Sequence, residues 1–177
     1  MTETKKVVKG GSFLIEDLSY QDIFTPEDFN EEHLMIAQTA ADFVEKEVVP
    51  QIEHLENHEF DRTVKLLKKM GELGLLAVDV PEEFEGLGLD KITSSLITEK
   101  MAGAGGFSLS YGAHVGIGSL PIVLFGNDEQ KTKYLPALAS GEKIAAYALT
   151  EPGSGSDALG ARTTAKLNAA GTHYILN

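Results

Sequence analysis

The sequence contains no cysteine and no tryptophan among its 177 residues. The absence of cysteine excludes a disulfide framework, a thiolate metal site and a cysteine nucleophile. Basic residues are also scarce, because 15 Lys and Arg stand against 27 Asp and Glu, for a formal net charge of −12. Phosphate backbones repel a chain this acidic, so we expect no nucleic acid and no anionic membrane among its partners.

The start of the sequence lacks the apolar core of a secretory signal, and the early acidic residues Glu3, Glu16 and Asp17 argue against a transit peptide. The longest apolar runs, such as residues 120–125, are too short to span a bilayer. With 42% hydrophobic residues the chain can still build a packed core. These features favour a soluble protein of the bacterial cytoplasm.

Apolar residues recur at helical spacing through most of the first 141 residues. A first helix is expected to begin at Thr25 or at Asn30, since both residues are good helix caps, and to end at Pro50. A second helix is expected to begin at Asp61 and to end at Gly71 or Gly74. Its predicted buried face consists of Val64, Leu67, Met70 and Leu73.

Between the later helices, residues 75–90 are rich in glycine and proline and predict an ordered surface loop. Asp90 is expected to cap a third helix, and Asn127 a last helix that ends near Gly141. Residues 107–125 are apolar but rich in glycine, which costs about 1 kcal/mol per residue in a helix interior. We nevertheless predict a buried helix there, because such glycines permit close approach of a backbone or a ligand.

After Gly141 the pattern changes from helical to extended. Residues 144–149 predict a strand, residues 151–160 a Gly/Ser loop, and residues 163–176 a hairpin. The last 36 residues are too few for a stable sheet domain, so the chain is expected to be a piece of a longer protein. The predicted division is an irregular arm (1–25), a helical domain (26–141) and the incomplete start of a β-domain (142–177).

The most informative segment for chemistry runs from Tyr147 to Asp157. A strand end followed by small residues exposes backbone N–H groups that can form an anion nest, and glycines let a ligand approach the backbone. Thr150, Ser154 and Ser156 add hydroxyl groups. By composition alone, the segment fits a flexible connection as well as a phosphate site.

The order Thr-Glu-Pro-x-x-Gly-Ser-Asp at residues 150–157 resembles the signature of the acyl-CoA dehydrogenases. Residues 126–142 are similar to the segment that precedes this signature in the family, and residues 73–88 to the family's first connecting loop. The resemblance covers roughly residues 30 to 177. It implies an α+β protein: an all-α amino-terminal domain, a β-barrel middle domain and a carboxy-terminal four-helix domain, usually assembled as a homo-oligomer. The present chain would cover the first domain and the first strands of the barrel.

The resemblance also implies an FAD site between the middle and carboxy-terminal domains. Tyr147 would face the cofactor, and Leu149 and Thr150 would hydrogen-bond the flavin ring. Gly155 and Ser156 would contact its phosphates, and Ser156 would also touch the acyl-CoA substrate. For Tyr147, a strand residue that packs one face on the core is an equal alternative.

The implied reaction is the α,β-dehydrogenation of a fatty acyl-CoA to a trans-2-enoyl-CoA, with an electron-transfer flavoprotein as acceptor. The family's catalytic base is a glutamate of the carboxy-terminal domain, which no residue here matches, so these residues alone are expected to be inactive. Glu151 belongs to the loop and is expected to make a structural contact. An acyl-CoA oxidase, a flavin monooxygenase relative, or a helical module that binds acyl groups or a partner without catalysis are the alternatives.

Residues 9–13, Thr25-Pro26 and residues 111–114 are similar to very-long-chain members of the family. Small residues at Gly112 and Ala113 would leave room for a long acyl tail, whereas the alternative is ordinary tight helix packing. His114 is a lone histidine on an apolar helix, which is typical of a satisfied core residue. Because no second ligand stands at metal-binding spacing beside it, we predict no metal site.

Overall fold

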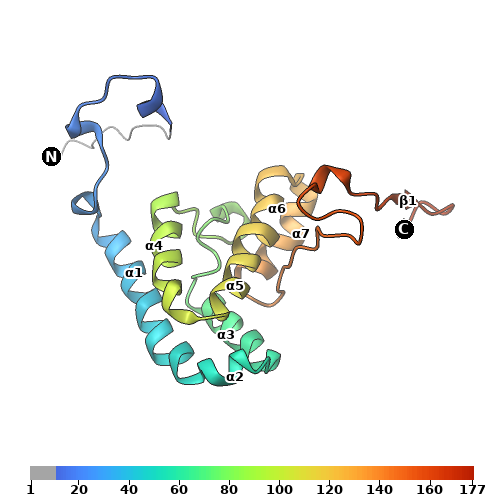
Figure 1. The fold of residues 1–177 in the computed structure, drawn as a ribbon, viewed down its shortest axis with the longest axis horizontal. Coiled ribbons are helices and arrows are strands. Elements are labelled where there is room, and N and C mark those ends of the chain that lie inside the picture. Colours follow the sequence, from blue (N-terminus) through green and yellow to red (C-terminus); the bar gives the residue numbers. More distant parts are fainter. Residues whose placement is uncertain (1–10) are drawn as a thin grey trace.

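The computed structural model describes residues 11–177 (Figure 1). A helical body is flanked at one end by an arm, residues 11–29, and at the other by a small hairpin. The arm contains three single 3-10 turns, Ser12–Leu14, Tyr20–Asp22 and Pro26–Asp28. The predicted fold class is confirmed, because a helical unit precedes a few short strands. The predicted division at residue 141 stays a prediction.

Of the two predicted starts of the first helix, Asn30 is confirmed, since it caps α1 (Glu31–Phe43), whereas Thr25 begins only a separate 3-10 turn. The predicted end at Pro50 is wrong. The helix continues through a π-helical turn (Val44–Val48) and a 3-10 turn (Val49–Gln51) into α2 (Ile52–Glu56). Proline lacks an N–H and its ring collides with a carbonyl of a regular α-helix, so the irregular turns accommodate it.

The second predicted helix forms as α3 (Phe60–Glu72), with Asp61 in its first turn rather than at its cap. The helix ends at Gly74, whose φ of +76° is a left-handed conformation that suits glycine. Its buried side chains are Leu66, Leu67 and Met70. The prediction was therefore wrong for Val64 and Leu73, which are 37% and 45% exposed.

Residues 75–90 form an ordered loop, as predicted, and most of residues 82–88 lie at the surface. The first half of the loop corrects the prediction, because it is buried. Leu75, Leu76, Val78 and Val80 are each at most 3% exposed. The loop satisfies its own backbone, because the N–H groups of residues 87 and 89 donate to the carbonyls of residues 77 and 78, both at 2.9 Å. A loop that pairs with itself in this way can enter a core without leaving polar groups unsatisfied. It includes one 3-10 turn, Glu82–Phe84.

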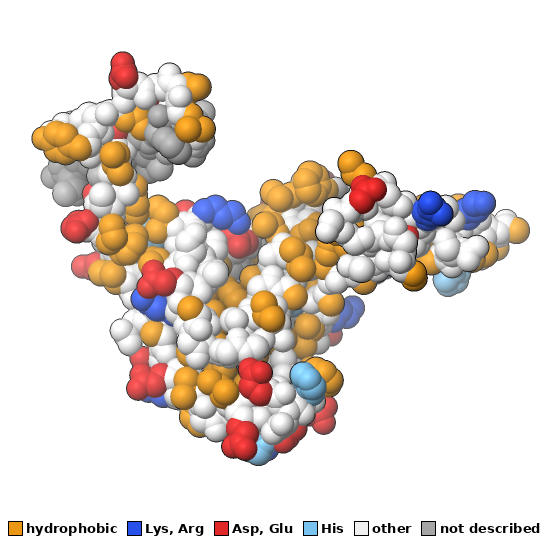
Figure 2. Space-filling model, in the orientation of Figure 1, with side chains coloured by type: hydrophobic (Ala, Val, Ile, Leu, Met, Phe, Trp, Pro, Cys, Tyr) orange, Lys and Arg blue, Asp and Glu red, His pale blue; other side chains and the backbone are white. Residues whose placement is uncertain are grey.

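Asp90 caps α4 (Lys91–Met101) as predicted, and a 3-10 turn (Ala102–Ala104) follows. The next helix comprises α5 (Phe107–Gly112), a π-helical turn (Ala113–Ser119) and α6 (Leu120–Phe125). The prediction of a buried helix holds for one face only, since Leu109, Ile117, Leu124 and Phe125 are exposed. Figure 2 shows hydrophobic side chains gathered over this helix.

The same helix corrects the expectation that no segment could span a bilayer. Its 19 residues, Phe107–Phe125, are long and apolar enough to cross a membrane by length and composition alone. The core helix of a soluble protein passes the same test. The sequence misled here because glycine and serine interrupt each apolar run without interrupting the helix.

The last helix, α7 (Asp128–Ala139), is capped by Asn127 and is followed by Gly141 with a φ of +74°, as predicted. The chain then becomes extended. Residues 144–149 form no strand, because no strand within residues 11–177 pairs with them. A 3-10 turn, Ala158–Gly160, precedes the predicted hairpin of β1 (Ala165–Leu167) and β2 (Tyr174–Leu176). These strands pair antiparallel, with Lys166 opposite Ile175.

Candidate functional site

Glu151 organises the loop between residues 147 and 163 from within. Its backbone exchanges two hydrogen bonds with Ser154, at 2.9 and 3.1 Å. Its carboxylate accepts the backbone N–H groups of Arg162 at 2.7 Å and Thr163 at 3.0 Å. The hydrogen bond from Arg162, with those from Thr163, lowers the pKa of Glu151. The predicted structural contact is thus present, and it fixes the loop's curvature.

Ser154 has a different place from the other loop hydroxyls. Its side chain is buried and its Oγ donates to the carbonyl oxygen of Asp157 at 2.6 Å. The expectation that this hydroxyl is offered to a ligand is therefore corrected, because the hydroxyl makes its hydrogen bond within the turn. Thr150 and Ser156 are exposed and have no hydrogen-bond partner within residues 11–177.

The backbone at the start of the loop also lacks hydrogen-bond partners. Within the described residues, the N–H and C=O groups of residues 146–150 make no hydrogen bond. A Cβ added at Gly153 or Gly155 would meet open space, so a ligand can approach the backbone there. Tyr147 is 54% exposed, so its alternative role in packing on the core is not fulfilled by residues 11–177. Donors that lack partners in an open, preshaped loop are what a flavin or phosphate acceptor requires.

His114 connects this segment to the helical body. Its Nδ1 accepts the backbone N–H of Ala145 at 3.0 Å, and its Nε2 lies 3.0 Å from the carbonyl oxygen of Leu138. These partners require a neutral ring that carries its proton on Nε2. Burial lowers the pKa of His114, although the bond to Leu138 opposes that shift. The prediction of a satisfied core histidine is confirmed, but its role in holding residue 145 was missed.

Gly118 permits the close approach of the extended segment to the helix. A Cβ at this position would lie 2.5 Å from the Cβ of Ala145 and 2.9 Å from the carbonyl oxygen of Ala113. Gly112 differs, since an added Cβ would meet nothing within 4 Å. Tight packing within residues 11–177 therefore does not explain Gly112, which lies with half-buried Ala113 beside the exposed apolar face. Its predicted role in an acyl pocket stays a prediction.

Other features of the surface do not add to this site. A hollow of about 400 Å³ lies between the turn after α1 and α3, and it is lined by charged side chains including Glu47, Glu59 and Arg62. None of its lining residues belongs to the loop. Among residues 11–177, no group of three or more His, Asp or Glu side chains could hold a metal ion.

Comparison with known families identifies the helical body. The family described as "Acyl-CoA dehydrogenase, N-terminal domain" matches residues 30–142. The chain belongs to the acyl-CoA dehydrogenase family. Its helical body is therefore the amino-terminal domain of this family, and the candidate loop lies directly after it.

Individual members of the acyl-CoA dehydrogenase family resemble the chain closely. A "Probable acyl-CoA dehydrogenase" of Bacillus subtilis is 72% identical over 170 residues, 96% of this chain and 29% of that protein. The mouse "Short-chain specific acyl-CoA dehydrogenase, mitochondrial" is 42% identical over 161 residues, 89% of this chain and 37% of that protein. The chain thus spans about a third of the length of these relatives.

A solved structure shares the fold over almost the whole chain. The acyl-CoA dehydrogenase of Bacillus anthracis complexed with FAD superposes with a TM-score of 0.92 at 69% identity. The match covers 97% of this chain and 29% of that one.

Proposed function

We propose that the chain is the amino-terminal part of an FAD-dependent acyl-CoA dehydrogenase that converts a fatty acyl-CoA to its trans-2-enoyl-CoA. One observation carries the proposal. In a chain of this family, the loop of residues 147–156 is held in shape from inside, by Glu151 and Ser154, while its outward donors have no partner within residues 11–177. A loop shaped in advance loses little entropy when a ligand binds.

The residues present fit a flavin. Backbone groups of Leu149 and Thr150, with the Thr150 hydroxyl, would hydrogen-bond the ring, and Tyr147 would lie against it. Gly155 and Ser156 would face the phosphates, where a glycine lets the backbone come close. The Bacillus anthracis relative, whose structure contains FAD, supports this assignment. When bound, the flavin would supply the acceptor for the hydride from the substrate β-carbon.

The protein's own groups would bind and orient the acyl-CoA. Ser156 would contact the substrate as well as the cofactor, through its exposed hydroxyl. Donors aimed at the thioester carbonyl would stabilise the negative charge that develops when the α-proton leaves. The base that takes this proton is expected outside residues 1–177. Glu151 does not serve, because its carboxylate already holds two backbone N–H groups.

We further propose a long acyl chain as substrate. The exposed apolar face beside Gly112 and Ala113, with open space at Gly112, supports room for a long tail. Relatives with a different preference, such as the mouse short-chain enzyme, share the same domain, so the helical scaffold alone does not set the chain length. An electron-transfer flavoprotein as acceptor, a homo-oligomeric assembly and a place in the bacterial cytoplasm complete the proposal.

The role of the loop is tested by Ser156→Ala in the full-length protein. We expect lower flavin content after purification and weaker acyl-CoA binding, because one donor to each ligand is lost, while thermal stability stays unchanged. A hydrogen bond to a charged partner contributes about 1.5–3 kcal/mol, so the fall in affinity should be about tenfold or more. Absorbance of bound flavin and equilibrium titration with acyl-CoA measure both effects.

The matched control for this experiment is Thr132→Ala. Thr132 is an exposed hydroxyl residue on α7, outside the loop, and its removal should change neither quantity. Unchanged flavin content together with unchanged acyl-CoA affinity in Ser156→Ala would contradict the role given to the loop.

A further inference from the structure

The arm, residues 11–29, lies beyond the start of α1 and apart from the helical body (Figures 1 and 2). Leu14, Ile15 and Tyr20 are 75%, 87% and 81% exposed. Neither of the two buried apolar clusters found within residues 11–177 includes an arm residue. The arm is therefore not held to the body by a share in its core.

Two aromatic rings of the arm meet one residue of the body. Phe24 and Phe29 are half-buried, and their ring centroids lie 6.4 and 6.0 Å from that of His33, in nearly perpendicular orientations. The two phenylalanine rings also contact each other at 5.8 Å. Edge-to-face contacts of this kind stabilise a pair of rings beyond the area that they bury.

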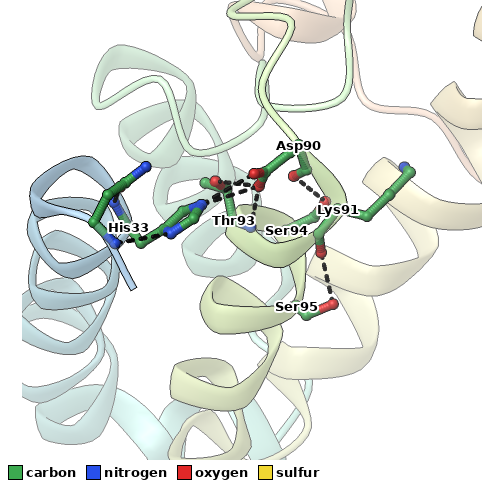
Figure 3. A network of polar contacts seen from close by, with 7 residues as sticks. His33, Asp90, Lys91, Thr93, Ser94 and Ser95 are labelled. Carbon is green, nitrogen blue, oxygen red and sulfur yellow. Dashed lines mark hydrogen bonds and ion pairs between the residues drawn. The ribbon is translucent and has the colours of Figure 1, made fainter. Parts of the chain in front are cut away.

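His33 itself is only 5% exposed, and both of its ring nitrogens are engaged. Nδ1 accepts the backbone N–H of Asn30 at 3.3 Å, and Nε2 lies 3.0 Å from Oδ2 of Asp90. The ring thus spans from the first turn of α1 to the start of α4 (Figure 3). One side chain joins the arm, α1 and α4.

Asp90 also accepts hydrogen bonds from α4. Its Oδ1 accepts the backbone N–H and the hydroxyl of Thr93, both at 2.9 Å, and so caps α4. Burial would raise the pKa of Asp90, but the hydrogen bonds from Thr93 and His33 together lower it. Because the carboxylate is fixed as a helix cap, it offers His33 a stationary acceptor.

We propose that His33 is a latch that fastens the arm to the helical body, so that residues 11–29 can detach as a unit while the body stays folded. The contacts described for the arm support this. The cap bonds of its turns, such as Gln21 N–H to Ser19 Oγ at 3.2 Å and Thr25 N–H to Asp28 Oδ2 at 2.8 Å, stay within the arm. Loss of the latch removes the aromatic contacts that hold Phe24 and Phe29, and so frees the backbone between them.

Another helix start in the same chain indicates which substitution of His33 would remove the latch and keep the helix cap. At the start of α7, Asn127 and Gln130 form the same reciprocal box that Asn30 and His33 form at α1, with distances of 3.0 and 2.9 Å. A glutamine at this position therefore keeps the cap. His33→Gln should preserve α1 while it removes the imidazole that reaches Asp90 and contacts the two phenylalanines.

The experiment compares His33→Gln and Phe24→Ala with the unchanged full-length protein. We expect cleavage by a glutamate-specific protease at Glu27, which lies between the two phenylalanines, to accelerate about tenfold in both variants, because the rate follows the population of the detached state. Cleavage at Glu16, which is exposed already, should stay unchanged. Deuterium uptake should rise in residues 24–29 and stay unchanged in α3. Phe60→Ala, which removes an exposed ring that stacks on His58, is the control and should change neither measurement.

Either of two outcomes would overturn the latch. Cleavage at Glu27 that stays unchanged in either variant would show that the arm is fastened elsewhere. Uptake that rises equally in the arm and in α3 would show that the substitutions loosen the whole domain, and that His33 is an ordinary stabilising residue.

Discussion

At the scale of single residues, His114 shows how a polar group is used inside this domain. The ring is fully buried, yet each nitrogen has one backbone partner, on α7 and on the segment that leads to the loop. A buried ring without these partners would cost about 1–3 kcal/mol. The residue therefore fixes where the extended chain leaves the helical body.

The lowered pKa of His114 predicts a dependence of stability on pH. The unfolded chain binds a proton at about its ordinary pKa of 6.5, and the folded chain resists protonation to a lower pH. Stability from this group is thus complete above 6.5 and falls as the pH drops below that value toward the folded pKa. Thermal unfolding of the full-length protein between pH 7.5 and 5.5 measures the effect.

His114→Gln serves as the comparison for this measurement. Glutamine does not titrate, so the variant should lose stability at every pH but show a shallower fall in unfolding temperature between pH 7 and 5.5. An identical slope in both proteins would show that other histidines, and not His114, produce the acid sensitivity.

Residues also differ in how well the sequence predicts their structural role. Glu151 and His114 could be predicted as structural, because one lies in a recognisable loop and the other stands alone on an apolar helix. The contact between His33 and Asp90 could not be predicted, since Asp90 lies 57 residues away along the chain. The pattern of an Asn followed three residues later by His predicts only a cap, and the long-range contact depends on how α1 packs on α4.

At the scale of elements, some glycines permit the close approach of a neighbouring element, and others face open space. Gly71 lies against the backbone of Ser140, where no Cβ fits, and this contact brings α3 next to the end of α7. Gly112 has open space around it. The sequence shows both as glycines in helices, and only the packing of neighbouring elements separates them.

This contrast predicts opposite results for the same substitution. Gly71→Ala should lower the free energy of unfolding of the full-length protein by about 1–3 kcal/mol or more, because the rigid backbone of Ser140 must move. Gly112→Ala should leave it unchanged or raise it by up to about 1 kcal/mol through helix propensity. Urea denaturation measures both changes.

Gly112→Ala should also shorten the longest acyl chain that the protein binds, because the added methyl group enters the proposed pocket. Two findings would count against this account of the glycines: a neutral Gly71→Ala, or a Gly112→Ala that destabilises as strongly as Gly71→Ala.

At the scale of the whole molecule, the features set by local chemistry were the ones that the sequence predicted. The caps of α1, α4 and α7 and the hairpin follow from local side-chain chemistry, and they were found where predicted. The strand at residues 144–149 and the outer face of the helix at residues 107–125 were misjudged. Within residues 11–177 no strand pairs with the first and nothing covers the second, and a local pattern does not show whether a partner is present.

The chain spans only about a third of the length of its relatives, so the most direct test of the central claim uses the full-length protein. The measurement is the visible absorption of bound flavin during titration with acyl-CoAs of increasing chain length, in the absence of oxygen. We predict a flavin band that bleaches stoichiometrically, most strongly with long chains, and that returns only slowly in air. A rapid return would indicate an oxidase on the same scaffold. A protein that binds no FAD, or whose flavin no acyl-CoA reduces, would contradict the account.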